Sequence, residues 1–251
     1  MSQISDRKVA LVTGATSGIG QAAAIAFAKE GYNVVVNGRD EKRGESVVRE
    51  ITSNGGQAVW LPSDVTDETA VESMVDQIMT TFGRLDCAFN NAGSGGRGGK
   101  VADLAVADFN QTIDGYLKSV FLCMKYEITA MVQQGNGAIV NNSSVDGKRA
   151  FAADPLYSAA KHGVIGLTKS AAVQYAQKGI RINAVCPGWV NTPALEQILS
   201  GSTATQRIIN QEPIGRIGQP EEIANAVVWL CSEQASFVVG TAMNVDGGYL
   251  S

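Results

Sequence analysis

The sequence predicts an α/β protein with one mostly parallel sheet that helices cover on both faces. Short runs rich in β-branched residues alternate with helical segments, no linker interrupts the alternation, and 45% of the 251 residues are hydrophobic. Parallel strands that are buried on both faces form such continuous apolar runs and need helical crossovers between them. A chain of this length can bury one sizeable core, so we expect a single doubly wound domain over residues 1–251.

The elements alternate in a regular order. The strands are the short apolar runs, and the helices are the longer segments between them. The predicted strands are Lys8–Thr13, Asn33–Asn37, Gln57–Leu61, Asp86–Phe89, Gly137–Asn142, Ile180–Cys186 and Ala242–Val245. The predicted helices are Gln21–Lys29, Glu41–Asn54, Thr66–Phe82, Ala107–Gln133, Leu156–Gln177 and Glu221–Ser232.

Ligands of such a fold bind beyond the carboxyl ends of the strands, where the strand order switches. Five residues that stand out for other reasons each follow a predicted strand, namely Gly14, Asp64, Asn90, Ser144 and Pro187. Two segments without the alternation, 94–100 and 189–218, lie at the same edge. Since loops there often carry function, we expect both to contact substrate and the second to act as a mobile lid.

Composition and charge exclude several classes of function. The net charge is −4 and the Lys and Arg residues are scattered, which argues against nucleic-acid binding. Residues 1–7 are too polar for a signal peptide, and no apolar run approaches the ~20 residues of a membrane span. The four cysteines are widely spaced in apolar segments, as expected of free thiols in a reducing cytoplasm. His162 is the only histidine, so a histidine metal cluster or a Ser-His-Asp triad is hard to build.

A glycine-rich turn joins the first strand to the first helix. Gly14, Gly18 and Gly20 let the backbone turn sharply and approach a pyrophosphate, while the N-terminus of the helix presents free N–H groups to that anion. The strand-turn-helix context favours a dinucleotide site. The alternative is a tight turn that only packs the helix on the strand.

A proton-transfer pair lies further along the chain. Tyr157 and Lys161 are four residues apart, so both side chains share one face of a helix, and Ser144 lies thirteen residues upstream of Tyr157. A nearby positive charge favours the tyrosinate, so we expect a lowered phenol pKa. Lowering the phenol pKa from about 10 to about 7 requires roughly 4 kcal/mol of stabilisation of the tyrosinate. One lysine is not expected to supply this alone, so a second positive charge, such as an oxidised nicotinamide, is its natural partner. The alternative is a chance spacing on a solvated helix.

Five motifs together resemble those of the short-chain dehydrogenase/reductases of about 250 residues. They are Thr13–Gly20, Asn90–Gly93, Ser144, the pair Tyr157 and Lys161, and Pro187–Gly188, and the match runs from residue 8 to 248. The resemblance implies a Rossmann-type sheet of seven strands and hydride transfer between a nicotinamide cofactor and a carbonyl or secondary alcohol. It also implies a homotetramer, because relatives pair the helices that correspond to Ala107–Gln133 and Leu156–Gln177 across two-fold axes.

The same resemblance implies roles for individual residues. Ser144 holds the substrate oxygen, Tyr157 is the general acid or base, and Lys161 lowers the tyrosine pKa and binds the nicotinamide ribose. Asn90 steadies the cofactor cleft. The implied cofactor-binding residues are Gly14, Thr16, Ser17, Gly18, Ile19, Gly20, Asn37, Gly38, Arg39, Asp64, Val65, Asn91, Ala92, Gly93, Tyr157, Lys161, Pro187, Gly188, Val190 and Thr192. A helix N-cap for Asp64 and a turn hydroxyl for Thr192 are the alternatives.

The end of the second strand favours NADP over NAD. Gly38 stands where NAD-preferring relatives carry Asp, and Arg39 follows it, so no carboxylate repels a 2′-phosphate and a cation lies beside it. In the alternative, Arg39 only begins a solvated helix and pairs with Asp40 or Glu41. Ser17 also replaces the basic residue of many NADP-dependent relatives.

Tyr116 departs from the family pattern. It stands where relatives have an asparagine that holds a relay water against the lysine. Its hydroxyl could enter the proton relay, in which case we expect Tyr116→Phe to lower turnover measurably; in the alternative the ring only fills a gap beside Lys161.

The sequence thus predicts a cytoplasmic NADP-dependent carbonyl reductase. An NAD-dependent alcohol or sugar dehydrogenase with the same residues is one alternative, and a cofactor-binding sensor or scaffold with little turnover is another. Asp146 and Arg97 suggest a polar substrate, although either can be an ordinary loop charge.

Overall fold

An all-parallel sheet forms the centre of the protein, as the fold class predicted from the sequence requires. The structure is a computed structural model that describes residues 7–198 and 202–251. Within these residues seven strands pair in the order β3-β2-β1-β4-β5-β6-β7. The strands are β1 (Val9–Val12), β2 (Asn33–Gly38), β3 (Gln57–Pro62), β4 (Cys87–Asn90), β5 (Gly137–Asn142), β6 (Ile180–Pro187) and β7 (Ala242–Val245). The strand order switches between β1 and β4, so the ligand crevice is expected beyond their carboxyl ends.

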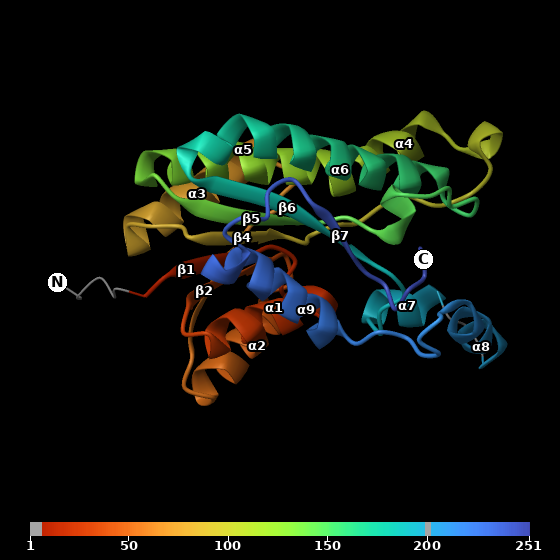
Figure 1. Ribbon diagram of the computed structural model, residues 1–251, viewed down its shortest axis with the longest axis horizontal. Helices are drawn as coiled ribbons and strands as arrows, with labels where there is room; N and C mark the ends of the chain where they lie inside the picture. The colour runs from red at the N-terminus through yellow and green to blue at the C-terminus, as the bar shows by residue number, and fades with distance from the viewer. Residues whose placement is uncertain (1–6, 199–201) are drawn as a thin grey trace.

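Helices cover both faces of the sheet (Figure 1). One layer contains α1 (Gly18–Lys29), α2 (Glu41–Ser53) and α9 (Pro220–Cys231), and the other contains α3 (Glu68–Phe82), α5 (Ser119–Gln134) and α6 (Pro155–Tyr175). The short helices α4 (Val106–Ile113), α7 (Pro193–Ile198) and α8 (Ser202–Gln211) lie at one end of the molecule, where the C-terminus also lies.

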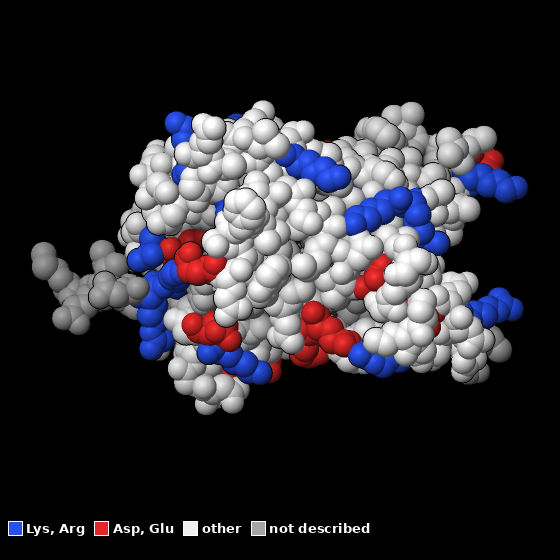
Figure 2. Space-filling view, in the orientation of Figure 1, with Lys and Arg blue, Asp and Glu red and all other residues white. Residues whose placement is uncertain are grey.

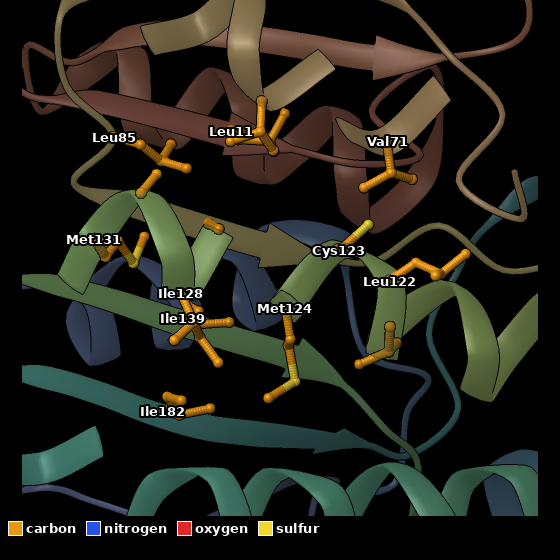
Figure 3. Packing of buried hydrophobic residues seen from close by; sticks show 14 of the residues in the cluster. Leu11, Val71, Leu85, Leu122, Cys123, Met124, Ile128, Met131, Ile139 and Ile182 are labelled. Atoms are coloured by element: carbon orange, nitrogen blue, oxygen red, sulfur yellow. The ribbon is translucent and has the colours of Figure 1, made fainter. Parts of the chain in front are cut away.

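Two apolar clusters, one on each face of the sheet, form the core. Successive residues of β1 point to opposite faces: Leu11 packs in the cluster under α3 and α5, whereas Ala10 and Val12 pack in the cluster with α1 and α9. Figure 3 shows the first cluster, in which Met131 of α5 and Ile139 of β5 lie together. Because both faces are covered, the central strands carry apolar residues at nearly every position, which is the pattern that predicted them.

One predicted helix proves to be three segments. The stretch expected as a single helix over Ala107–Gln133 consists of α4, a wide π-helical turn over Asp114–Lys118, and α5. The wide turn brings Gly115 against the backbone oxygen of Ser94, and the Ser119 hydroxyl donates to the Gly115 carbonyl at 2.9 Å. The loop after β4 therefore crosses the helix at this point and breaks its regular hydrogen bonding.

The segment 189–218, expected as a lid, contains helices α7 and α8. A parallel bridge between Val190 and Gly218 closes its base. Residues 199–201 lie outside the described part of the chain.

On the face drawn in Figure 2, Lys and Arg side chains are dispersed among Asp and Glu. Among the described residues, no helix is both long and apolar enough to cross a membrane.

Candidate active site

Two adjoining cavities lie beyond the carboxyl ends of the strands. The first, of about 330 Å³, is called the cofactor cavity below, and the second, of about 320 Å³, the substrate cavity. Ile19, Thr192 and Ala194 line both. Of the residues expected to bind the cofactor, the first is lined by Gly14, Thr16, Ser17, Gly18, Ile19, Asn37, Gly38, Arg39, Asp64, Val65, Asn91, Ala92, Gly93 and Thr192. Tyr157, Pro187, Gly188 and Val190 line the second.

Gly20 and Asn90 lie outside both cavities. Gly20 packs α1 on the glycine-rich turn, since a Cβ atom there would collide with the Gly14 carbonyl. The Asn90 side chain is buried and donates to Glu127 Oε2 at 2.9 Å and to Asn141 Oδ1 at 3.0 Å. Asn90 therefore joins β4, β5 and α5 in the core, whereas its neighbour Asn91 faces the cofactor cavity.

The glycine-rich turn and α1 together fit an anionic group. Gly14 and Gly18 have φ angles of 61° and 55°, and a Cβ atom on Gly14 would lie 2.7 Å from the Ala92 Cα. Ser17 precedes α1 without a capping hydrogen bond from its side chain, so the first N–H groups of the helix remain open toward the cavity. The residues present therefore fit the pyrophosphate of a dinucleotide.

The opposite end of the cofactor cavity carries one exposed cation. Arg39 Nη1 lies 3.7 Å from Asp64 Oδ2, and two thirds of the Arg39 side chain is exposed. Asp64 also accepts hydrogen bonds from the backbone N–H and the hydroxyl of Thr66, and the Thr66 backbone bond is the main cause that lowers the Asp64 pKa. Asp67, not Asp64, caps α3. The carboxylate of Asp64 thus lies beside Arg39 in the lining of the cofactor cavity.

The catalytic candidates come together where β5 meets α6. Asp154 caps α6 by accepting from the Tyr157 N–H at 3.0 Å, and this places Tyr157 in the first turn of the helix, one turn before Lys161. Lys161 Nζ lies 5.6 Å from the centre of the Tyr157 ring and donates to the Asn142 carbonyl at 2.7 Å. Ser144 Oγ accepts from the Asp146 N–H at 3.1 Å, so its own proton is available to donate toward the Tyr157 oxygen.

Burial sets the pKa values of this pair. It raises the pKa of Tyr157, and the Ser144 hydrogen bond only partly counters the effect, while Tyr116, Asp146 and Asp154 add to it. Burial also lowers the Lys161 pKa to about 8. The lowered phenol pKa expected from the Tyr157–Lys161 spacing is therefore not what the protein alone provides, because burial of the hydroxyl raises the pKa by more than the Ser144 hydrogen bond lowers it.

Asn142 and Asn91 connect this pair to the cofactor cavity. The Asn142 side chain donates to Asn91 Oδ1 at 2.9 Å, and the Asn91 side chain donates to the carbonyls of Thr13 and Gly14. The Thr13 hydroxyl in turn accepts from the Asn91 N–H at 3.0 Å. The ends of β1, β4 and β5 are thus held in one hydrogen-bonded unit that positions Lys161.

The ring of Tyr116 occupies the place expected for a relay residue. Lys161 Nζ lies 4.9 Å from its centre, and the ring meets the Tyr157 ring edge-on with 5.0 Å between the centroids. Among the described residues its hydroxyl has no hydrogen-bond partner. Gly93 and Gly95 make room for the ring, since a Cβ atom on either would lie 2.6 Å or 2.5 Å from it.

The substrate cavity is mostly apolar and has one charged wall. Asp146 and Arg149 form an ion pair in this wall, with 3.1 Å between Arg149 Nε and Asp146 Oδ1. Arg97, which the sequence also suggested, lies outside both cavities, and its guanidinium contacts the Asp103 carbonyl.

Sequence reasoning did not find two residues that line the substrate cavity, Arg149 and Phe151. Their only sequence signal is position, five and seven residues beyond Ser144. Trp189 and Leu195, which also line this cavity, lie in the segment 189–218 that was expected to contact substrate. The Asn142 carbonyl that holds Lys161 has no signal at all, because a backbone atom carries no residue preference.

Comparisons with known proteins agree with this geometry. A family described as Enoyl-(Acyl carrier protein) reductase matches residues 14–250. The chain is 42% identical to a cyclohexanol dehydrogenase of Acinetobacter sp. (strain SE19), covering 100% of this chain and 98% of the relative. It is 43% identical to a cis-4-hydroxycyclohexanecarboxylate dehydrogenase of Sinomonas cyclohexanicum, covering 99% of each. A variant of the actinorhodin polyketide ketoreductase solved with NADPH superposes with a TM-score of 0.92 at 38% identity, covering 99% of each chain.

Proposed function

The chain belongs to the short-chain dehydrogenase/reductase family, and on that premise we propose that this NAD(P)-dependent oxidoreductase passes a hydride between NADP(H) and a compact cyclic alcohol or ketone. One observation carries the proposal. The substrate cavity of about 320 Å³ has walls of Phe151, Trp189 and Leu195 and ends at Ser144 and Tyr157. A six-membered carbocycle suits these walls, and two relatives are named for substrates of that kind.

In this reaction Ser144 binds the substrate oxygen, Tyr157 transfers the proton and Lys161 adjusts the Tyr157 pKa. When bound, the nicotinamide cofactor supplies or accepts the hydride. The Ser144 hydroxyl donates to the substrate oxygen and holds it beside the Tyr157 hydroxyl, which gives its proton in reduction or takes one in oxidation. Lys161, fixed by the Asn142 carbonyl, lies with its Nζ 5.6 Å from the centre of the Tyr157 ring and favours the tyrosinate while it is charged.

Arg39 supports the preference for NADP. Its guanidinium lines the cofactor cavity and is mostly exposed, so it is available to a 2′-phosphate despite Asp64 nearby. Gly38 adds no second carboxylate beside the phosphate. A Cβ atom at Gly38 would lie 2.7 Å from Thr16 Cγ2, so a change to Asp also needs a smaller residue at position 16.

An NAD-dependent alcohol or sugar dehydrogenase is the second candidate, favoured by Asp64 beside Arg39 because a carboxylate opposes a phosphate. A sensor or scaffold is less favoured, since binding alone does not require Ser144, Tyr157 and Lys161 to meet.

We further propose that residues 1–251 form one domain, that the segment 189–218 acts as a lid, and that the protein is a homotetramer. A cytoplasmic location suits the four free, buried cysteines of the described residues.

The test compares NADPH and NADH consumption with cyclohexanone and with a linear hexanone. We expect faster oxidation of NADPH than of NADH and higher kcat/KM for the cyclic ketone.

Arg39→Ala should weaken NADPH binding by roughly 1.5 to 3 kcal/mol, the worth of a charged hydrogen bond. Arg43→Ala is the matched control, because Arg43 lies in the first turn of α2, directly after the turn that carries Arg39, pairs with Asp40 and does not line the cofactor cavity. Equal NADPH affinity in Arg39→Ala and Arg43→Ala would exclude the role of Arg39, and no turnover with any ketone would exclude the proposed reaction.

A further inference from the structure

The charged wall of the substrate cavity is not explained by hydride transfer. Proton transfer uses Ser144, Tyr157 and Lys161, and an apolar ring needs no ions beside it. Yet Asp146 and Arg149 lie in this wall, and only a tenth of the Asp146 side chain is exposed. Removing charges from water costs free energy, and the two side chains replace the lost water for each other only at Arg149 Nε, so the other polar atoms of the pair remain for a ligand.

Arg149 is held rigidly but keeps free donors. Its Nε donates to Asp146, and its guanidinium stacks over the Tyr249 ring at 4.5 Å from the centroid. Among the described residues no side-chain or backbone acceptor takes a hydrogen bond from its two Nη groups. The edge of the guanidinium and one of its faces are therefore fixed, while up to four N–H donors remain for a ligand.

Arg149 also stands at a boundary. Together with Phe151 and Trp189 it separates the substrate cavity from an outer hollow of about 610 Å³ that Tyr249 borders. A molecule that reaches Tyr157 through this hollow passes the Asp146–Arg149 pair. The pair thus lies where a bound ring can meet it with a group other than the reacting oxygen.

The charges of the wall indicate which group it binds. Asp146, Asp154 and Arg149 are the ionisable residues of the cavity besides the two tyrosines, and Asp154 is occupied as the cap of α6. Two carboxylates against one guanidinium disfavour an anion. A hydroxyl both donates and accepts, so it can donate to Asp146 and accept from Arg149 at once.

We propose that Asp146 and Arg149 form a second recognition point for a hydroxyl group on the substrate, so that the enzyme acts on cyclic diols and hydroxyketones. The proposal rests on the proposed function for the position of the reacting oxygen. A substrate with one oxygen leaves the ion pair without its partner, and the loss of a hydrogen bond to a charged group weakens binding.

The test measures binding apart from turnover. The NADPH-saturated enzyme cannot oxidise an alcohol, so calorimetry can compare cyclohexanol with the three positional isomers of cyclohexanediol. We expect at least one diol to bind more than about tenfold tighter than cyclohexanol, as one charged hydrogen bond allows. Arg149→Met, which keeps the stem and removes the donors, should abolish most of this preference, and Arg97→Met, on a neighbouring loop outside both cavities, should retain it.

Two further variants separate recognition from packing. Tyr249→Phe keeps the ring under the guanidinium and should retain the preference, whereas Tyr249→Leu should reduce it. Diols that bind no tighter than cyclohexanol, a preference that survives Arg149→Met, or a hydroxycyclohexanecarboxylate that binds tighter than every diol would overturn the proposal. A diol preference in binding without hydride transfer to any ketone would overturn the proposed function and leave the second recognition point standing.

Discussion

At the residue scale, the reactivity of Tyr157 depends on a balance between burial and charge. Burial raises the Tyr157 pKa and lowers the Lys161 pKa to about 8, so the protein alone holds both groups in their neutral forms more than water does. An oxidised nicotinamide would supply a positive charge that favours the tyrosinate. We therefore expect proton transfer and cofactor binding to be coupled through Tyr157 and Lys161.

Asp146 offers a test of this balance. Its carboxylate raises the Tyr157 pKa, so Asp146→Asn should lower it. Alcohol oxidation needs the tyrosinate, which forms as pH rises through the Tyr157 pKa. The rise of kcat/KM for cyclohexanol should therefore move to lower pH in Asp146→Asn, and Arg149 without its partner adds to the same shift. The control is Asp103→Asn, an exposed site outside both cavities. An unchanged profile, or one moved to higher pH, would contradict the electrostatic role of Asp146.

Variants of Tyr116 test whether its ring or its hydroxyl supports turnover through Lys161. The structure places the ring face at 4.9 Å from Lys161 Nζ, and a cation over a ring is stabilised by about 0.5 to 2 kcal/mol. Tyr116→Phe should therefore keep kcat near the wild-type value, and Tyr116→Leu should lose up to roughly tenfold. A loss of tenfold to a thousandfold in Tyr116→Phe, about what an acid–base contact is worth, would instead put the hydroxyl in the proton relay, as the sequence favoured.

At the scale of elements, the strands and most helices could be predicted, but the turn that carries Tyr116 could not. The strands are apolar at nearly every position because both faces are covered, and that pattern is local. The helical pattern of Ala107–Gln133 is also local and runs through the π-helical turn without interruption. The break comes from Ser94, which presses on Gly115 from another part of the chain.

The candidate site also has a part that could be predicted from the sequence and a part that could not. Ser144, Tyr157 and Lys161 could be predicted because their spacing is fixed within one strand-loop-helix unit. The stacking of Arg149 on Tyr249 could not, since the two residues meet only when the C-terminal segment packs against the loop after β5. Contacts between distant segments leave no periodic signal in either one.

The loop after β4 and the π-helical turn should have mutually dependent sequences. Gly95→Ala would place a Cβ atom 2.5 Å from the Tyr116 ring, and overpacking of this kind costs about 1 to 3 kcal/mol. We expect a lower Tm and a lower kcat in Gly95→Ala, and recovery of both when Tyr116→Asn is added. Gly166→Ala is the control, because a Cβ atom there meets no atom within 4 Å. If Gly95→Ala destabilises equally with Asn at position 116, the two elements are independent.

At the scale of the whole molecule, α5 and α6 expose apolar side chains on the outer layer. Phe121 of α5 is 49% exposed and Val173 of α6 is 81% exposed. We expect these helices to pair across two-fold axes in a homotetramer, because a symmetric interface buries each patch against its copy. Light scattering at micromolar concentration should give about four times 26.3 kDa. Val173→Asp should reduce the mass, whereas the same change at Val101, an exposed valine in the short 3-10 helix Val101–Asp103, should not. A wild-type mass of 26.3 kDa would contradict the tetramer.

If Tyr157 transfers the proton that accompanies hydride transfer, loss of its hydroxyl alone should stop turnover and leave cofactor binding intact. NADPH oxidation with cyclohexanone is followed in wild type and in Tyr157→Phe, which deletes only the hydroxyl, and NADPH binding is titrated in both. We expect kcat to fall by roughly a hundredfold to ten-thousandfold while NADPH affinity stays close to wild type. A Tyr157→Phe variant that keeps most of the wild-type rate would contradict it.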